Sequence, residues 1–478
     1  MNEAKPSSSH MRRVAILCAN NVQVDSRVRK IGRSAKGLGF DPLIIGISRS
    51  QGFEDTEFDG IRTLLVDNSA QRFRHFSASH LNAFPWSLLA YRSNDQVEFN
   101  NLNLMSEHCS IAGTDGHASW FRVNKYKINL IIYTIRRLAT RREYLVYVKP
   151  NKVRYTLRRW RLKLSAGSRW AYYEPTLLDF SALMIPELEK FSPDVIHAND
   201  TATIVAALAY KRNFPNTKII YDVHEWVHGL PGLDPLKADV YGAVQDRYIH
   251  CFDEVITVSS ALADLIRNKY EIDPKVVENF PWASSDKKVT SIRSLLRIDK
   301  SVPILVYSGW LAPERGIGTV LRALVKLDSC EFVIVTNQDN QAKEVIEAAR
   351  TLGVSNRLHI LPYVNPDEII EYLSSCDIGL IPLDHAPNHE ISRITKFFEY
   401  AHARLPIVCS DLKIMSDSIY ELGIGNVFEA GNTDSLVEAV KITLDNADEI
   451  RTRYTDDLLD GMTWNVNFQT LKDSYNEK

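Results

Sequence analysis

Three features of secreted and membrane-spanning proteins are missing from the 478-residue sequence. No apolar run reaches the roughly 18 residues that span a bilayer, so no transmembrane helix is predicted. The polar start, residues 1–11, has no apolar segment of the kind found in secretory signals, and we expect a disordered leader there. The six cysteines show no CxxC or Cys/His metal spacing. The prediction is therefore a cytoplasmic protein with reduced cysteines, without structural zinc or disulfides.

Glycine is missing from the first loop of the chain. Residues 12–19 have the continuous apolar pattern of a buried strand, and residues 26–38 have that of a helix. The loop between them, residues 20–25, has none of the glycines with which dinucleotide-binding proteins approach a pyrophosphate. A Rossmann dehydrogenase is therefore disfavoured, and we expect Asp25, Ser26 or Arg27 to cap the helix rather than to touch a substrate.

Strand and helix patterns alternate along most of the chain, which is typical of α/β proteins. With 45% hydrophobic and 24% charged residues the composition is that of an ordinary soluble protein, and the length exceeds one ordinary domain. We predict two Rossmann-like, doubly wound domains. The expected parts are an N-terminal domain over 12–285, a linker without a core period over 286–302, a C-terminal domain over 303–455, and a helical tail over 456–478 that packs back on the first domain.

A basic and aromatic insertion interrupts the alternation at about residues 70–175, with helices expected around 129–142 and 153–165. Residues 122–169 carry fifteen Lys or Arg and one acidic residue, whereas the whole chain has a net charge of −2. The insertion could attach the protein to an anionic membrane face, bind nucleic acid, or neutralise acidic surface elsewhere on the chain. We favour the membrane and place nucleic acid last, because no nucleic-acid motif accompanies the charge.

Polar side chains follow two predicted strands of the N-terminal half. Asp200 comes after the strand over 195–197, and Asp222 and His224 come after the strand over 218–221. Ligands of open α/β sheets bind outside the carboxyl ends of the strands. His224 is the best candidate to touch a reacting group, because the acids beside it can tune it; an ordinary structural histidine is the alternative.

Two loops of the C-terminal half are suited to an anion. The loop over 309–316, GWLAPERG, lies between a strand and a helix, and its Arg315 presents a guanidinium suited to phosphate oxygens. The segment over 387–411, PNHEISRITKFFEYAHARLPIVCSD, is interpreted as a polar loop, a helix and a strand. The start of that helix would aim free amides at a diphosphate.

The helix of this segment has an amphipathic pattern. Its apolar residues fall near one stripe, and Lys396, Glu399 and Arg404 are expected on the polar face. Glu399 lies about one turn beyond the helix start, where its carboxylate could accept the two hydroxyls of a ribose. The alternative is a buried crossover in which Glu399 simply pairs with Lys396.

Several pieces of both halves together resemble the GT-B glycosyltransferases of family 4, a retaining group that includes many bacterial cell-surface polysaccharide and glycolipid enzymes. The pieces are VIHANDTATIVAALA, KIIYDVHEW, DEVITVSSAL, YSGWLAPERGIGTVLRAL and TKFFEYAHARLPIVCSD. The resemblance covers both halves but not the basic insertion. It implies an acceptor domain at the N-terminus and a nucleotide-sugar domain at the C-terminus, facing each other across a cleft.

The resemblance also implies roles for particular residues. Glu399 would match the second glutamate of the family's E-x7-E motif and hold the donor ribose. The amides of Ile394, Thr395 and Lys396 would hold the diphosphate, and Arg315 would neutralise the leaving nucleotide. His224 would contact the transferred sugar, and Asp200 and Asp222 are grouped with it as contacts of sugar or acceptor.

The sequence departs from the family pattern at three places. The first glutamate of E-x7-E would stand at position 391, which is Ile391, and Glu390 is one place early; we expect Glu390 to take the catalytic role if the loop bulges. Position 310, often arginine in the family, is Trp310. The glycine-rich first loop is missing. These departures affect the expected site more than the expected fold.

The expected function is retaining transfer of a sugar from a UDP- or GDP-sugar to a cell-surface glycan or lipid-linked acceptor. No DxD-type cluster stands where it would hold Mg²⁺, so we expect neither a metal nor another cofactor. The expected location is the cytoplasm, with peripheral attachment to the inner membrane face as an option. The alternatives are a nucleotide-sugar epimerase on the same fold, and a catalytically silent sugar-nucleotide-binding scaffold.

Overall fold

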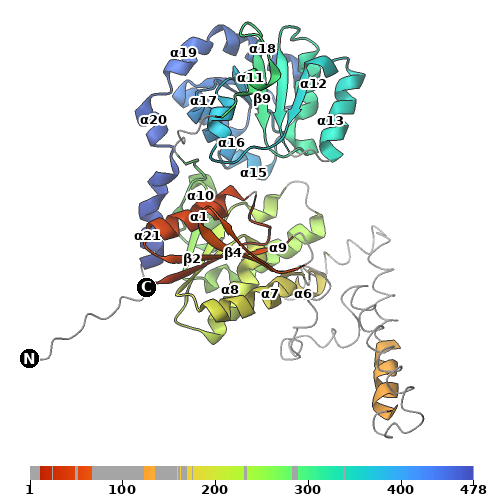
Figure 1. Ribbon diagram of the computed structural model, residues 1–478, viewed down its shortest axis with the longest axis vertical. Helices are drawn as coiled ribbons and strands as arrows, with labels where there is room; N and C mark the ends of the chain where they lie inside the picture. The colour runs from red at the N-terminus through yellow and green to blue at the C-terminus, as the bar shows by residue number, and fades with distance from the viewer. Residues whose placement is uncertain are drawn as a thin grey trace, which may run out of the picture. The chain divides into compact units, whose positions relative to one another are not determined.

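The computed structural model describes residues 11–23, 25–48, 52–66, 123–134, 159, 162, 170–174, 176–230, 234–282, 289–336 and 340–476. Contacts divide the chain into two compact units, which are described separately. The first unit is Met1–Tyr221 with Asp234–Asp253, and the second is Asp222–Leu233 with Glu254–Lys478. Both are built from parallel strands and the helices that connect them (Figure 1).

The first sheet has the strand order β3-β4-β2-β1-β5-β6-β7-β8. The pairs β1–β2, β1–β5 and β2–β4 are parallel, and β3 is added as an antiparallel hairpin partner of β4. The chain adds β2 and β4 on one side of β1 and then returns to add β5 on the other side. The topological switch point therefore lies between β1 and β5. The strands are β1 (Arg13–Leu17), β2 (Asp41–Ile47), β3 (Glu54–Phe58), β4 (Ile61–Val66), β5 (Val195–Asn199), β6 (Lys218–Val223), β7 (Glu254–Thr257) and β8 (Lys275–Val276).

Helices follow the strands of this sheet, and their starts are chemically marked. Asp25 caps the first helix by accepting a hydrogen bond from the Val28 amide (3.1 Å), which confirms the predicted cap. Asp234 caps α9, which has a proline at its first position. The helices are α1 (Ser26–Gly37), α6 (Trp170–Tyr173), α7 (Thr176–Phe191), α8 (Ile204–Asn213), α9 (Pro235–Tyr248) and α10 (Ser260–Tyr270).

The second sheet has the order β11-β10-β9-β12-β13-β14, and all of its pairs are parallel. This is the strand order of a doubly wound nucleotide-binding domain, with the switch between β9 and β12. The strands are β9 (Ile304–Ser308), β10 (Glu331–Val335), β11 (Leu358–Leu361), β12 (Ile378–Ile381), β13 (Ile407–Ser410) and β14 (Gly425–Phe428).

Two apolar layers cover the faces of the second sheet. One is formed with α12, α13 and α18, and the other with α14, α16 and α17. On α16 the predicted stripe is confirmed, because Phe397, Phe398, Tyr400 and Ala401 are at most 1% exposed. The helices are α11 (Ile292–Leu296), α12 (Ile317–Leu324), α13 (Asn340–Thr351), α14 (Ile369–Leu373), α15 (Pro387–Glu390), α16 (Thr395–His402), α17 (Lys413–Leu422), α18 (Thr433–Asp445), α19 (Ala447–Thr452), α20 (Asp456–Asp460) and α21 (Phe468–Asn476).

Several local predictions need correction. The stretch over 286–302 is not without a core contact, because α11 lies in it and Ile292 is buried in the core. The expected polar loop after Pro387 begins with α15. Cys251 is exposed, unlike the four other cysteines that the structure describes. Near the end of the chain, Trp464 is buried and packs beside Trp282.

Most of the basic insertion lies outside the described residues, including the helix expected over 153–165. Residues 123–134 are helical, so this helix begins earlier than the predicted 129–142, whose second half is not among the described residues. Arg159 forms an ion pair with Asp239 of α9. In the part of the chain that the structure describes, no helix has both the length and the apolar character needed to cross a bilayer.

Candidate functional site

The loops after β9 and β12 meet at the switch point of the second sheet. Gly316, between these strands in the chain, has φ +67°, and a Cβ built on it would lie 1.6 Å from the carbonyl oxygen of Pro382. The Asp384 amide also donates to the Glu314 carbonyl at 3.0 Å. The close backbone contact explains why glycine follows Arg315, and it fixes the two loops against each other at the carboxyl edge of the sheet.

Lys396 lies inside this edge and not on the polar face of α16 as the pattern predicted. Its residue is 8% exposed, and its Nζ lies 3.5 Å from the ring centroid of Tyr307 on β9. The expected alternative, an ion pair with Glu399, is not found, and no hydrogen bond or ion pair of the Lys396 ammonium occurs among the described residues. Burial, and then the charge of Arg315, lower the pKa of Lys396 well below its usual value.

Arg315 is the second cation of this edge. Its side chain is half-buried, and its Nε is enclosed without a hydrogen-bond partner. No ion pair of the guanidinium is found in the part of the chain that the structure describes. Its charge contributes to lowering the pKa of both Lys396 and His389, so the three side chains share one electrostatic environment. An enclosed guanidinium Nε without a hydrogen-bond acceptor costs stability unless a ligand supplies the acceptor.

The first turn of α16 adds unpaired amides. Ile394 is the residue that caps α16, and no side chain accepts a hydrogen bond from the helix start. The amides of Ile394, Thr395 and Lys396 have no acceptor among the described residues. The Thr395 hydroxyl is held by the Asn279 amide group at 2.7 Å. Free amides at a helix start favour an anion, as expected for these three residues.

Glu399 and Glu390 occupy different surroundings. Glu399 is half-buried on α16, one turn beyond the helix start. Its charge acts on the pKa of Lys396 in the opposite direction to burial and Arg315, without reversing the net lowering. Glu390 ends α15; its Oε1 lies 2.6 Å from His385 Nδ1, and its Oε2 accepts from the Lys413 amide at 2.8 Å. The hydrogen bond between Glu390 and His385 raises the pKa of His385. The ribose role of Glu399 and the catalytic role of Glu390 stay predictions.

The predicted residues at the ends of β5 and β6 fall into different units. His224 and Asp222 are in the second unit, where His224 Nε2 lies 3.1 Å from the buried Asp222 carboxylate. That contact orients the imidazole ring. Asp200 belongs to the first unit and has φ +62°, a conformation that non-glycine residues rarely adopt. Its position relative to His224 is therefore not assigned.

Three residues of the site were missed by the sequence analysis. Asn388 on α15 accepts from the Trp226 amide at 2.7 Å and donates to the Trp226 carbonyl at 3.0 Å, which ties α15 to the segment that carries His224. His389 is buried, and its Nδ1 donates to the Asp384 carbonyl at 2.7 Å. Tyr307 provides the surface on which Lys396 lies. Pro387 at the first helical position was the available signal for α15.

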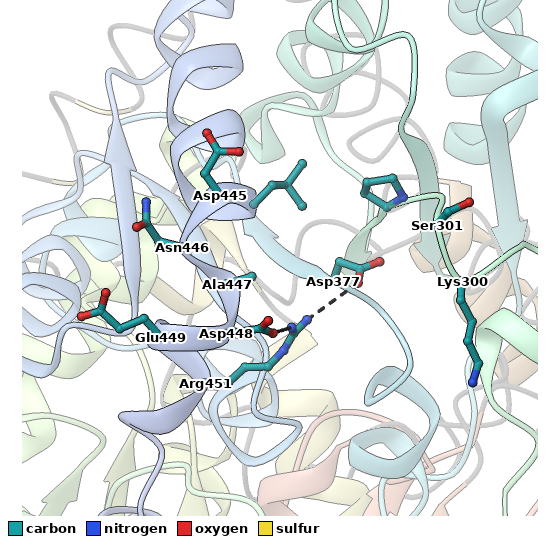
Figure 2. Close-up of a pocket in the computed structure, with 11 residues that line it drawn as sticks. Lys300, Ser301, Asp377, Asp445, Asn446, Ala447, Asp448, Glu449 and Arg451 are labelled. Atoms are coloured by element: carbon teal, nitrogen blue, oxygen red, sulfur yellow. Dashed lines mark hydrogen bonds and ion pairs between the residues drawn. The ribbon is translucent and has the colours of Figure 1, made fainter.

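A separate pocket of about 330 Å³ lies at the opposite, amino edge of the second sheet. Figure 2 shows Arg451 directed at Asp377 and Asp448, with Asp445 and Glu449 nearby. Ligands of open α/β sheets bind at the carboxyl edge, so we do not assign the donor site here. The described residues contain no group of three or more His, Cys, Asp and Glu suited to a metal ion; metal independence stays a prediction.

Comparisons with known proteins agree with this architecture. Residues 289–456 match the family model described as "Glycosyl transferases group 1", and residues 131–280 match "Glycosyltransferase Family 4". An uncharacterized glycosyltransferase of Methanocaldococcus jannaschii is 27% identical over 236 residues, which are 45% of this chain and 59% of that relative. The matched part thus spans less than two thirds of the relative's length.

Solved structures are similar over nearly the whole chain. Sucrose-phosphate synthase from Thermosynechococcus elongatus has a TM-score of 0.65 at 12% identity and 98% coverage of both chains. A glycosyltransferase from Rickettsia africae has a TM-score of 0.56 at 12% identity, covering 98% of this chain and all of that one. An E. coli trehalose-6-phosphate structure bound with UDP-2-fluoro glucose has 0.56 at 12% identity, covering 98% of this chain and 99% of that chain.

The two sheets and these neighbours define the fold class, which is the GT-B fold of glycosyltransferases. The two family models cover both halves of that fold. The chain belongs to glycosyltransferase family 4, the group 1 glycosyl transferases. The resemblance drawn from the sequence is thereby confirmed, as is the predicted fold.

Proposed function

We propose that this protein transfers a sugar from a UDP- or GDP-sugar to a cell-surface glycan or lipid-linked acceptor, with retention of configuration and without a metal. One observation carries the proposal. Arg315 and Lys396 are basic side chains without a hydrogen-bond or ion-pair partner among the described residues, and they lie with the free amides of α16 at the switch point of a nucleotide-binding sheet. The arrangement is complementary to a diphosphate, because each unpaired donor would gain an oxygen acceptor.

The same groups suit the chemistry of glycosyl transfer. Cleavage of the bond between sugar and phosphate builds negative charge on the diphosphate and positive charge on the anomeric carbon. Cations and amides held at the diphosphate therefore stabilise the transition state more than the bound substrate. Glu399 would hold the ribose, and His224, oriented by Asp222, would contact the transferred sugar. Attack on the face that the phosphate leaves, with that phosphate accepting the acceptor's proton, gives retention.

The basic insertion supports an acceptor at a membrane surface. In the described helix over 123–134, Ile128 and Ile131 are 57% and 59% exposed, and Leu130 and Ile132 are also exposed. Aliphatic side chains beside the many basic residues of 122–169 match an anionic lipid interface. We propose a peripheral protein of the cytoplasmic membrane face, whose acceptor is lipid-linked or growing at that surface.

Nucleotide release from a panel of UDP- and GDP-sugars, with and without membrane extract, tests the proposal. UDP-sugars come first, because a structural neighbour was bound with UDP-2-fluoro glucose. Release that depends on extract supports the transferase, with the anomeric configuration of the product testing retention. Isomerisation of the sugar without release would instead establish an epimerase. EDTA should leave release unchanged.

One observation favours a second candidate, a protein that binds sugar nucleotides without turning them over. Both oxygens of Glu390, the expected catalytic carboxylate, already have partners on the protein. Trp310 stands where the family often has arginine. Binding of UDP or GDP without release from any donor, with extract present, would support this candidate over the transferase.

A further inference from the structure

The ammonium group of Lys396 is the least compensated polar group of the site. Lysine is rarely buried without a partner, yet Lys396 is 8% exposed and its ammonium lies over the ring of Tyr307. The described residues offer it neither a carboxylate nor a carbonyl oxygen. The face of a tyrosine ring attracts a cation, but more weakly than the carboxylate that normally accompanies a buried lysine.

Charged and titratable groups face Lys396 from every element packed around it. Arg315 acts from the loop before α12, Glu399 from α16 itself, and Cys409 from β13. The Tyr307 hydroxyl on β9 is already committed, since it donates to the Trp310 carbonyl at 2.7 Å. Burial and Arg315 disfavour the ammonium form, and the attraction of Glu399 does not offset them, so the pKa of Lys396 falls. The empty site therefore disfavours the ammonium form relative to a lysine in water.

The backbone of the β9 loop leaves room for this side chain. A Cβ on Gly309 would lie 2.9 Å from Lys396 Nζ, and Gly309 has φ +142°. The next residue, Trp310, is 51% exposed and brings no charge into the site. The space beside Gly309 is thus occupied by a basic group that comes from α16 and not from the loop.

We propose that Lys396 is the second diphosphate-binding cation of this protein and that it takes up a proton when the donor binds. This inference rests on the proposed function, because it assigns a diphosphate to the same site. A diphosphate beside Lys396 brings opposite charge that Arg315 alone does not neutralise, and this favours the ammonium form. Because a proton is bound together with the nucleotide, the affinity should rise as the pH falls. This rise should occur in the pH range between the pKa of Lys396 in the empty site and its higher pKa in the complex.

Calorimetric titration of the full-length protein with UDP and with GDP tests this inference. Repeating it in buffers of different ionisation enthalpy gives the number of protons taken up. Measurements above about pH 7.5 avoid the phosphate's own titration, which has a pKa of about 6. Wild type should take up a fraction of a proton that rises toward about one per nucleotide as the pH passes the empty-site pKa of Lys396.

Lys396→Met keeps an unbranched side chain of similar size and removes the titrating group. It should bind the nucleotide roughly 10- to 100-fold more weakly, without proton uptake. Its melting temperature should not fall, because the ammonium loses no hydrogen bond or ion pair to the described residues and the methionine side chain can still pack on the Tyr307 ring. Lys326→Met is the matched control: Lys326 is an exposed lysine paired with Asp434 in the same unit, and its loss should change neither affinity nor proton uptake.

The outcomes separate the two proposals. Wild-type binding without proton uptake at any pH, or equal uptake by Lys396→Met, would overturn the role of Lys396 and leave the transferase standing. Failure of wild type to bind either nucleotide would overturn both. Uptake that is lost in Lys396→Met and kept in Lys326→Met supports the inference.

Discussion

The two edges of the second sheet both carry charged side chains, and two groups of them, one at each edge, differ in how they are paired. At the amino edge, Asp377 accepts from Arg293 at 2.6 Å and from the Ile304 amide at 2.7 Å. At the carboxyl edge, Arg315 and Lys396 have no partner among the described residues. The same domain thus holds a paired Asp377 at one edge and, at the other, two basic side chains without a hydrogen-bond or ion-pair partner among the described residues.

This contrast separates stability from binding. A paired charge at the amino edge stabilises the fold, so its removal should lower stability and leave ligand affinity unchanged. An unpaired, enclosed cation costs stability in the empty protein and is retained where a ligand will neutralise it. The pocket at the amino edge is lined by charged side chains that already pair with one another, such as Arg451 with Asp377 and Asp448. Removing a paired charge at the amino edge should therefore lower stability and spare ligand affinity, whereas removing an unpaired cation at the carboxyl edge should lower ligand affinity and spare stability.

Arg315→Ala should have the largest effect. Loss of the guanidinium that faces the leaving diphosphate should reduce turnover about 10²- to 10³-fold, comparable to losing one oxyanion donor. The melting temperature should stay level or rise, because the Arg315 side chain has no hydrogen bond or ion pair to the described residues that could be lost. Nucleotide release and thermal unfolding measure the two quantities. Turnover close to wild type would remove Arg315 from the site.

Gly316→Ala should destabilise the carboxyl edge through backbone geometry. A Cβ there meets the Pro382 carbonyl and requires φ +67°, so the free energy of unfolding should fall by about 3 kcal/mol or more. Gly353→Ala is the control, since Gly353 has φ +73° and open space around it; about 1 kcal/mol is expected. Urea unfolding compares them. Equal losses would contradict the close contact of the two loops.

Glu399→Ala should weaken donor binding and spare the fold. Loss of two hydrogen bonds to a ribose should raise the KM for the donor about 10- to 100-fold. Inorganic pyrophosphate is the control ligand. Because it has no ribose, it should bind the variant and the wild type with equal affinity. If pyrophosphate binding fell as much as UDP or GDP binding, Glu399 would act on the phosphates instead.

Asp377→Ala should show the opposite signature from Arg315→Ala. It removes the acceptor of Arg293 Nη2 and of the Ile304 amide, so the free energy of unfolding should fall by about 1 to 3 kcal/mol. Nucleotide affinity should be unchanged, because the amino edge takes no part in binding. Denaturant melts and calorimetry measure the two effects. A parallel loss of affinity would contradict the division between the edges.

Ile131→Asp should have the smallest effect and should act only at membranes. Placing a charge on the exposed aliphatic face of the helix over 123–134 should reduce partitioning onto anionic vesicles roughly 5- to 50-fold, with turnover of a soluble acceptor unchanged. Reversing the charges of Arg136, Arg137, Arg141 and Arg142 should have the same direction. Unchanged partitioning in both variants would refute membrane attachment.

The fold was largely predictable because its signals are periodic. The strand patterns over 12–19, 195–197 and 218–221 gave β1, β5 and β6 within about two residues, and the stripe of α16 followed from helical spacing. Short elements were missed for the converse reason. α15 spans only four residues, and β3 has the mostly polar and exposed sequence EDTEF, so neither contains an apolar run.

The site was only partly predictable, because its decisive contacts are tertiary. The candidacy of Arg315 followed from a loop between a strand and a helix. The burial of Lys396 did not follow from the sequence, because a helical pattern places a lysine toward solvent. The residues beside its buried side chain, Tyr307 and Gly309, lie about 90 residues earlier in the chain. The tie between Asn388 and Trp226 likewise joins residues that no local pattern relates.

The most direct test of the account is the rise in melting temperature that saturating UDP or GDP produces. Wild type and Asp377→Ala should both gain stability from the better nucleotide, by the same increment, even though the variant starts lower. The double variant Arg315→Ala/Lys396→Met should gain none, because the diphosphate has lost both of its cations. A double variant that still responds like wild type would show that nucleotides bind elsewhere and would contradict the assignment of the carboxyl edge.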